Sequence, residues 1–403
     1  MSTLVRQHWE ANLGAFGGRR SRQGFFYNAF VPGLIADLAP QLPHDVAQVA
    51  AEAEEAIRAL NRVPPRHGSL ETLARQLLRA ESVASSRIEG LELSHRRLAK
   101  AAFAQDGSDV SAASVIANMS AMEEAVRLSS TGRALTVNGL LKIHRVLFGA
   151  FASLDGGHLR TEQNWIGGAS SSPRDAEFVP PPPGKVRVLL EDLCRFLERD
   201  DLPAVIQAAI AHAQFETIHP FADGNGRVGR CLIHVVLRRR GLAPRYVPPI
   251  SLVLATNAKA YVGGLTDYRA GQGSEWCATF CAAVRTASTE AERFAATVDS
   301  LQARWRAAAA EPRKNSAASR IIESLPAFPI LDVGTAQQIA KCSNQAARLA
   351  LAQLEDAKVV ARVNVGRRNR VWEALGLFEI INTFEQHLAT RKGGRTKLRP
   401  APR

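Results

Sequence analysis

The sequence has no long apolar segment. No stretch of the 403 residues approaches the roughly 18 uninterrupted apolar residues that suggest a membrane-spanning helix. The opening residues, MSTLVRQHWEANLG, contain no apolar signal core. With 46% hydrophobic and 22% charged residues, the composition is that of a globular protein. We therefore expect a cytoplasmic location and no membrane partner, and the length favours more than one domain.

Cysteine is also scarce, with five in the whole chain. An odd and small number of cysteines in a long chain does not form a disulfide framework. Cys277 and Cys281 lie four residues apart in a helical pattern, but no other Cys or His accompanies them at metal-ligand spacing. They are therefore predicted to be small core residues.

Acidic residues are too few to balance the basic ones, since 38 Asp and Glu face 51 Lys and Arg, which gives a formal charge of +13. The excess is concentrated in residues 313–403, which carry 16 basic and 7 acidic side chains. Residues 391–403 have no acidic side chain at all. This asymmetry favours an acidic partner for the C-terminal region, with nucleic acid as the first choice.

One stretch of the chain, His219 to Arg230 (HPFADGNGRVGR), concentrates an imidazole, a carboxylate, glycines and two arginines. Apolar residues recur at helical spacing before it, from Ile206 to Ala213, and after it, from Val228 to Val236. The stretch is therefore predicted to begin as a loop between two helices.

The glycines and arginines of this loop suit a phosphate. Gly224 and Gly226 let backbone N–H groups approach an anion closely, and the N-terminus of the following helix favours negative charge. Arg227 and Arg230 are three residues apart, so they share a helix face and can offer forked donors to successive phosphate groups.

The acidic and titratable residues complete this chemistry. Asp223 suits a hard cation such as Mg²⁺, which binds one or two carboxylates together with phosphate oxygens. His219 lies at the edge of the phosphate site, where a neutral imidazole can take a proton from an incoming hydroxyl. The set of residues fits in-line attack on a nucleotide phosphate.

Two other interpretations of the loop exist. The spacing of Gly224, Gly226 and Gly229 also matches a dinucleotide-binding fingerprint, which needs a preceding strand and an acidic residue about 20 positions later. Here a helix precedes, and the next acidic residue is Asp267. The second alternative is a plain glycine turn with solvated arginines, which a shorter match would favour.

The twelve residues resemble the signature of the Fic family, H-x-F-x-[DE]-G-N-G-R-x-x-R, and fill every defining position. The resemblance implies a mostly helical core with a short β-hairpin, and transfer of AMP from ATP to a protein hydroxyl. It implies these roles: His219 as base, Asp223 as Mg²⁺ ligand, Phe221 as apolar anchor, Gly224, Asn225 and Gly226 as phosphate cradle, and Arg227 and Arg230 as clamps on the β- and γ-phosphates. On a looser motif, it implies that Asn257 and Tyr261 lie near the adenosine.

A second motif precedes this core. A helix with an apolar stripe from Leu70 to Ile88 ends in Ser85-x-x-x-Glu89-Gly90. Taken alone, Glu89 is an ordinary surface residue before a helix cap. The motif also resembles the inhibitory sequence [ST]-x-x-x-E-[GN] of one Fic class, which implies that Glu89 pairs with Arg230 and blocks seating of the γ-phosphate.

Residues 157–180 are punctuated by Gly, Ser and Pro around β-favouring residues, which predicts a hairpin. It is either a plain surface hairpin or, by the resemblance, a flap. As a flap, its residues Trp165, Ile166, Gly167 and Gly168 would hold a segment of the target protein by strand addition.

The C-terminal part is predicted to contain three helices within 316–357 and a β-hairpin whose strands flank residues 366–369. This pattern resembles a winged helix, in which Arg367 and Arg368 would reach phosphates. The module is either a DNA-binding unit or a protein contact surface. Residues 391–403 form a basic tail, predicted to be disordered.

The predicted fold class is mostly α, with a Fic-type core, a hairpin flap and a C-terminal winged-helix-like module. The predicted regions are an N-terminal helical region (1–112), a catalytic core (113–290), a connecting helix and linker (291–314), the winged-helix-like module (315–390) and the tail (391–403). The predicted activity is protein AMP transfer from ATP with Mg²⁺, repressed by Glu89. Removal of AMP by the same site, a nucleotide-sensing DNA-binding regulator and a homodimer remain open.

Overall fold

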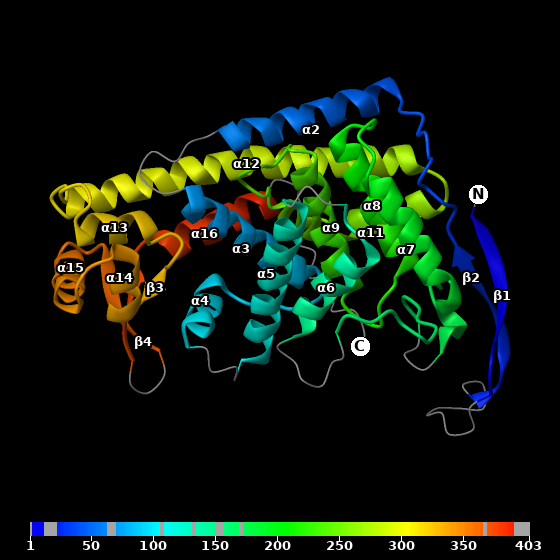
Figure 1. The fold of residues 1–403 in the computed structure, drawn as a ribbon, viewed down its shortest axis with the longest axis horizontal. Coiled ribbons are helices and arrows are strands. Elements are labelled where there is room, and N and C mark those ends of the chain that lie inside the picture. Colours follow the sequence, from blue (N-terminus) through cyan, green and yellow to red (C-terminus); the bar gives the residue numbers. More distant parts are fainter. Residues whose placement is uncertain are drawn as a thin grey trace.

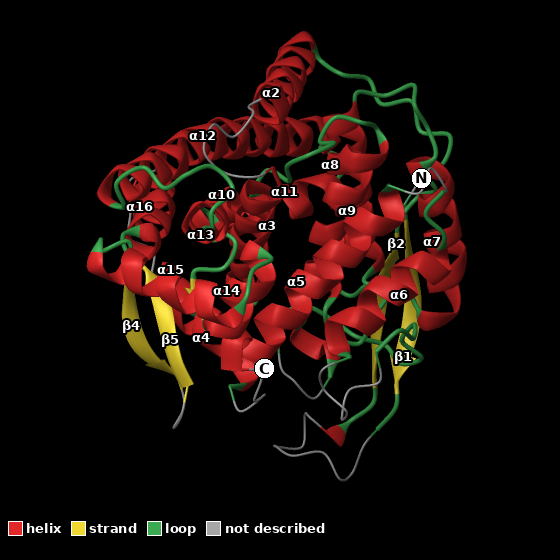
Figure 2. Cartoon of the chain, turned by 60° about the vertical axis from the view of Figure 1, so that its left-hand side comes forward, coloured by secondary structure: helices red, strands yellow, loops and turns green. Residues whose placement is uncertain are grey.

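The computed structural model describes residues 2–11, 22–62, 70–104, 109–130, 134–149, 156–168, 172–365 and 369–390. The chain is mostly helical (Figures 1 and 2). In the N-terminal half the elements are β1 (Thr3–Trp9), β2 (Phe25–Val31), α2 (His44–Arg62), α3 (Leu70–Ile88), α4 (His95–Ala104), α5 (Val110–Ser129), α6 (Val137–Phe148), the 3-10 turn η1 (Pro173–Asp175) and α7 (Pro183–Leu197). In the C-terminal half they are α8 (Ala204–Ile218), α9 (Asn225–Arg239), α10 (Ile250–Thr256), α11 (Ala258–Arg269), α12 (Gly273–Ala308), α13 (Ala317–Ser324), β3 (Ile330–Leu331), α14 (Val333–Ala340), α15 (Asn344–Asp356), β4 (Val360–Val365), β5 (Asn369–Ala374) and α16 (Leu377–Thr390).

Helix α8 lies at the centre of the molecule. Every one of its residues is buried, which is typical of a helix that is apolar on all sides and surrounded by others. Helices α7, α9, α11 and α12 pack around it. Because α8 leads directly into the His219 loop and α9 leads out of it, the core of the molecule holds both ends of that loop.

Helix α3 lies against α5, α9 and α10. Its buried Glu81 accepts hydrogen bonds from His234 Nε2 of α9 at 2.9 Å and from the Ser251 backbone N–H of α10 at 2.7 Å. A buried carboxylate is tolerated where such donors surround it. These bonds fix the position of α3 relative to α9 and α10.

The longest helix, α12, spans 36 residues and has α2 alongside it (Figure 1). It runs without a break through residue 290, where the sequence places the end of the catalytic core. Cys277 and Cys281 are buried on this helix.

The N-terminal strands β1 and β2 form an antiparallel pair with Leu4 opposite Phe30. The Phe30 N–H donates to the Val179 carbonyl at 2.9 Å, so β2 lies beside the segment predicted to be the flap. Figure 2 shows this pair at the opposite side of the molecule from β4 and β5.

The hairpin predicted within 157–180 is reduced to one antiparallel bridge, between Ile166 and Phe178. No named strand forms in the described part of this segment. Gly167 and Gly168 both have φ of +74°, which turns the chain away from an extended ladder. The prolines from Pro180 to Pro183 have no N–H to donate, so they prevent pairing beyond Val179.

The C-terminal module contains α13, α14, α15 and an antiparallel sheet of order β3-β5-β4. The likeness to a winged helix stays a prediction. Arg367, Arg368 and the basic tail at 391–403 lie outside the described residues. Helix α16, which follows the sheet, packs against α12, α10 and α4.

Candidate active site

His219 ends helix α8 in a left-handed conformation, with φ of 49°. Its N–H donates to the Phe215 carbonyl at 2.9 Å, which closes the last turn. Arg160 Nε donates to the His219 carbonyl at 2.8 Å. The His219 backbone is therefore held at the point where α8 opens into the loop.

Arg160 is a site residue that the sequence analysis missed. It is buried, and its guanidinium also donates to the carbonyls of Glu162 at 3.1 Å and Pro181 at 2.5 Å. It therefore ties the 160–181 segment to the His219 loop. The sequence holds no signal for this role, because a single arginine in a predicted hairpin resembles a solvated side chain.

Burial, together with the nearby Arg160 charge, lowers the pKa of His219 to about 4. The imidazole is therefore neutral at neutral pH. A neutral imidazole is the form that can accept a proton.

The loop after His219 is closed by Asn225. Its Oδ1 accepts from the Phe221 N–H at 2.8 Å, and its Nδ2 donates to the Phe221 carbonyl at 2.8 Å. Both polar atoms of the amide are therefore engaged inside the loop. A phosphate contact from Asn225 would use its backbone N–H, at the start of α9.

Phe221 anchors the loop to helix α6. Its ring is fully buried and stacks on His144 of α6, with centroids 3.8 Å apart. His144 Nε2 in turn lies 3.1 Å from the Asp223 carbonyl, and its Nδ1 accepts from the Gly157 N–H at 2.8 Å. Because Nδ1 accepts, Nε2 carries the proton and donates to Asp223.

Two glycines fit the loop closely. Gly224, with φ of +79°, precedes α9, and a Cβ there would meet the Phe148 ring at 2.7 Å. At Gly226, a Cβ would meet the Glu89 carboxylate and the Arg230 guanidinium. Glycine at 226 is therefore what lets Glu89 approach α9.

The Asp223 side chain is 71% exposed, with Oδ2 3.7 Å from Arg227. Its Oδ1 accepts from the Gly224 N–H at 2.5 Å. No group of three or more His, Cys, Asp or Glu side chains gathers around a metal position in the described part of the chain. One accessible carboxylate beside a phosphate site still fits Mg²⁺, which takes its other ligands from phosphate and water.

The two motif arginines have different surroundings. Arg227 is buried, donates to Ser114 Oγ at 3.3 Å and lies over the Phe148 ring at 5.3 Å. Arg230 is 1% exposed and is held by helix α3 and the turn after it. Its Nε donates to Ser85 Oγ at 2.8 Å, and its Nη2 donates to the Ser85 carbonyl at 2.9 Å and to Glu89 Oε1 at 2.7 Å.

Glu89 and Arg230 shift each other's pKa in opposite directions. Burial acts to raise the pKa of the Glu89 carboxyl, but the Arg230 charge and hydrogen bond outweigh it and lower the pKa. Burial likewise opposes the charge of Arg230, and Glu89 raises the pKa of Arg230. The two groups therefore form an ion pair beside the loop.

The two residues predicted near the adenosine lie in different settings. Tyr261 is buried, and its hydroxyl is 2.9 Å from His212 Nε2. Asn257 is exposed and caps α11, since its Oδ1 accepts from the Ala260 N–H at 3.2 Å. This cap accounts for Asn257 without any ligand.

Glu216 is a second residue that the sequence analysis missed. It lies three positions before His219 and is buried, and burial raises its pKa to about 7. The Arg230 charge opposes this shift. A carboxyl in the last turn of an apolar helix carries no sequence signal for its closeness to the arginine.

Residues 165–168 of the predicted flap approach the loop through their neighbour Asn164, whose Nδ2 donates to the Phe221 carbonyl at 3.0 Å. The Trp165 ring meets Trp9 of β1 edge-on at 5.4 Å. The N-terminal strand pair and the flap segment therefore meet beside the loop.

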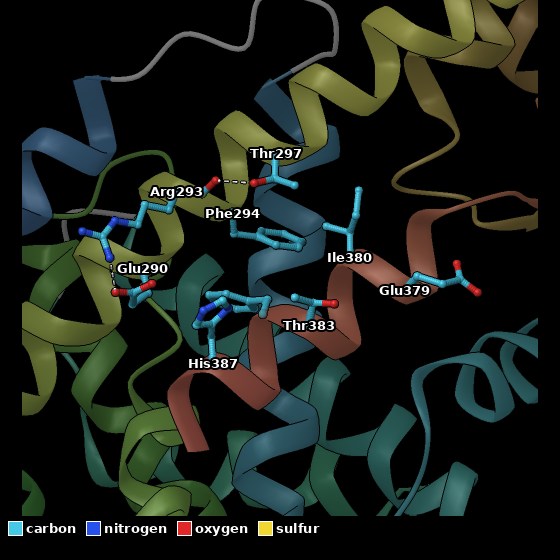
Figure 3. Close-up of a pocket in the computed structure, with 9 residues that line it drawn as sticks. Glu290, Arg293, Phe294, Thr297, Glu379, Ile380, Thr383 and His387 are labelled. Atoms are coloured by element: carbon cyan, nitrogen blue, oxygen red, sulfur yellow. Dashed lines mark hydrogen bonds and ion pairs between the residues drawn. The ribbon is translucent and has the colours of Figure 1, made fainter. Parts of the chain in front are cut away.

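A groove of about 480 Å³ lies elsewhere, between α12 and α16 (Figure 3). Phe294 of α12 and Ile380 of α16 line it, together with polar residues such as Arg293 and Thr383. None of the predicted site residues lines this groove.

In the described part of the chain, no helix is long and apolar enough to cross a membrane.

Comparison with known proteins confirms the predicted family. Residues 134–237 match the model of the Fic/DOC family, and residues 47–127 match that of the Fic/DOC family N-terminal region. Residues 47–237 therefore contain a Fic/DOC domain preceded by the N-terminal region of that family.

The chain is similar to two curated relatives. The protein adenylyltransferase Fic of Drosophila sechellia is 28% identical over 197 residues, which are 47% of this chain and 38% of the relative. That of Drosophila persimilis is 35% identical over 117 residues, which are 28% of this chain and 21% of the relative. The chain thus spans less than half the length of these relatives.

Among solved structures, a Fic family protein from Desulfovibrio desulfuricans G20 superposes with a TM-score of 0.52 and 21% identity. The match covers 84% of this chain and 98% of that one. At this identity, the likeness shows the fold.

Proposed function

We propose that this chain transfers AMP from ATP to a hydroxyl group of a target protein. The observation that carries the proposal is the position of His219, a neutral imidazole at the end of α8, beside a glycine-rich loop that opens onto the N-terminus of α9. The names of the curated relatives support the same reaction.

The proposed reaction is an in-line displacement at the α-phosphorus. The target hydroxyl oxygen attacks, and His219 takes the hydroxyl proton. The new P–O bond joins AMP to the target, while the bond from the α-phosphorus to the bridging oxygen breaks and pyrophosphate leaves. General-base assistance of this kind contributes about 10² to 10⁴ in rate.

The phosphates would lie over the start of α9. The backbone N–H groups from Asn225 to Arg227 are among the first four of the helix, which have no intrahelical partner. Arg227 and Arg230 would hold the outer phosphates. Asp223 would hold Mg²⁺, which when bound neutralises charge on the phosphates.

Glu89 would repress this reaction. In the structure its carboxylate accepts a hydrogen bond from Arg230, the arginine that would bind the γ-phosphate. A charge-assisted hydrogen bond is worth about 1.5–3 kcal/mol, which corresponds to roughly ten-fold to hundred-fold repression. The target segment would pair with the flap at residues 165–168, so that its hydroxyl faces His219.

The reverse reaction uses the same residues. Glu89 would then orient a water molecule that attacks the phosphorus of a modified hydroxyl, and AMP would be released.

A DNA-binding role of the C-terminal module is a second candidate. One observation favours it: helix α15 exposes Gln345, Arg348 and Leu349 near its N-terminal end. Arginine and glutamine are side chains that read base edges when a helix enters the major groove. Binding that falls steeply with salt would support this role, and no DNA affinity at low salt would remove it.

The test is the Glu89→Gly protein incubated with ATP labelled at the α-phosphate and a cell lysate. Label should appear on protein bands, and much less label should appear when the chain keeps Glu89. Protein bands without label, together with normal ATP binding, would contradict AMP transfer. Release of label from already modified proteins would favour the reverse reaction.

A further inference from the structure

The turn that carries Glu89 is attached to the C-terminal helix α16 on both sides. Arg87, two residues before Glu89, donates to Glu385 Oε2 at 2.8 Å. His95, at the start of α4, lies 2.8 Å from Glu385 Oε1. One carboxylate therefore joins the end of α3 to the beginning of α4, and the Glu89 turn lies between the two contacts.

This contact is well shielded from water. The side chain of Glu385 is 13% exposed, that of Arg87 27% and that of His95 3%. Burial acts to raise the pKa of Glu385, but the bonds from His95 and Arg87 lower it to about 2. Glu385 is therefore charged at neutral pH, and a shielded ion pair is screened little by salt.

A second contact runs parallel to the first. Arg96, the next residue of α4, pairs with Glu373 of β5 at 2.9 Å and with Glu379 of α16 at 3.1 Å. Its guanidinium also lies 5.2 Å from the centre of the Phe378 ring. The segment after Glu89 is thus held by both the sheet and the last helix of the C-terminal region.

On the other side, Glu89 reaches α9 through its hydrogen bond to Arg230. The side chain of Glu89 is 37% exposed, and α3 ends at Ile88, so Glu89 lies in the turn beyond the helix. The orientation of Glu89 toward Arg230 therefore depends on how the turn is held, and Glu385 holds the residues that flank it.

We propose that Glu385 is a positioning residue that keeps Glu89 against Arg230, so that repression depends on the docked C-terminal helix. The inference rests on the proposed function. When Glu385 is lost, the Glu89 turn moves away from α9 more often, and Arg230 becomes available to phosphate. A partner that displaces α16 would act in the same way.

The first test is Glu385→Gln, which keeps the size of the side chain and removes its charge. Transfer of labelled AMP should rise at least about five-fold, the lower end of typical coupling between sites. In the Glu89→Gly protein the same substitution should change nothing, since the group that it positions is absent. Simple destabilisation would instead lower activity in both backgrounds.

The matched control is Glu355→Gln. Glu355 also has two partners, Arg362 Nε at 2.9 Å and Trp372 Nε1 at 3.0 Å, but both lie within the C-terminal module. Its loss should leave transfer unchanged. An equal rise in both variants would overturn the proposal, because it would reflect general loosening of the module.

A second readout separates this proposal from the proposed function. Hydrogen exchange of the amides in residues 86–95 should speed up about ten-fold in Glu385→Gln and not in Glu355→Gln, since local opening sets the exchange rate. Unchanged exchange overturns the positioning role, whether or not AMP is transferred. Faster exchange without any transfer in Glu89→Gly would leave the positioning intact and contradict the proposed function.

Discussion

A single proton decides whether His219 can act as a base. Burial and the Arg160 charge lower its pKa to about 4, so the imidazole is free to accept a proton throughout the physiological range. In the Glu89→Gly background, His219→Ala should lower AMP transfer by about 10² to 10⁴ and leave ATP binding largely intact. A labelled transfer assay and isothermal titration would measure the two effects.

The control for this prediction is His44→Ala, which removes an exposed histidine at the start of α2 and should change neither quantity. Full activity of the His219→Ala protein would contradict the assignment of His219 as the general base.

Arg160 allows a second prediction at this scale. Arg160→Met leaves the carbonyls of His219, Glu162 and Pro181 without their donor, which should cost at least about 2 kcal/mol of unfolding free energy. It also removes a positive charge that lowers the pKa of His219. The acid limb of the pH–activity profile should therefore move to higher pH.

Urea denaturation and a pH–rate profile would measure these changes. Arg160→Lys keeps the charge but not the forked geometry, so it should lose stability while the acid limb stays nearer its original position. An unshifted acid limb in Arg160→Met would show that the two side chains are not coupled.

At the scale of elements, polar contacts with α9 recur along α3 and in the turn that follows it. Glu81 meets His234, and Ser85 and Glu89 both meet Arg230. Glu81→Gln replaces an acceptor by an amide whose NH₂ group faces donors, so it should lower the unfolding free energy by about 1–3 kcal/mol. Thermal melting would detect this, and an unchanged melting temperature would contradict it.

The accuracy of the sequence analysis differed between the inhibitory helix and the flap segment. The helix expected in the Leu70–Ile88 stripe agrees with α3, because an apolar stripe at helical spacing is a local signal. The flap hairpin is not confirmed as a pair of strands, because β pairing depends on partners distant in the sequence. The segment expected to pair with itself forms one bridge and uses Val179 to contact Phe30.

The motif allowed the position of the loop to be predicted, but not its internal bonds. The resemblance implied that Asn225 belongs to the phosphate cradle, and the structure adds that its amide closes the loop on Phe221. Arg160 and Glu216 could not be found, since their importance comes from burial beside groups that lie elsewhere in the chain. The contact between Glu385 and Arg87 joins positions 298 residues apart, and no local pattern encodes it.

At the scale of the whole molecule, buried neutral histidines determine how acid affects folding. Burial lowers the pKa of His144 to about 4 and that of His212 to about 3, and His219 behaves alike. Below the pKa of about 6.5 that histidine has in the unfolded chain, the unfolded chain binds protons that the folded chain does not bind. Stability should therefore fall as pH drops from about 6.5 toward 4.

Glu216 acts in the opposite direction, because its pKa is raised to about 7 and the folded state protonates first. One carboxyl offsets only one of the three imidazoles, so the net slope keeps its sign. Urea denaturation at pH 7.5, 6 and 5 would measure it, and His212→Asn should flatten the slope by about one proton. Equal stability at pH 7.5 and 5 would refute the account.

Helix α12 limits the ways in which the molecule can move. Its 36 residues form a rod about 54 Å long, which packs against α2 and α8 and also against α13 and α16 (Figure 1). A rod shared by both ends of a molecule does not allow free rotation of one end about a linker. We therefore expect motion of the C-terminal region to be a small sliding of α16 along α12, the shear type of displacement. A shift of α16 by about 1 Å is comparable to the change in distance that breaks a hydrogen bond. Such a small shift would therefore be enough to break the hydrogen bond between Glu89 and Arg230.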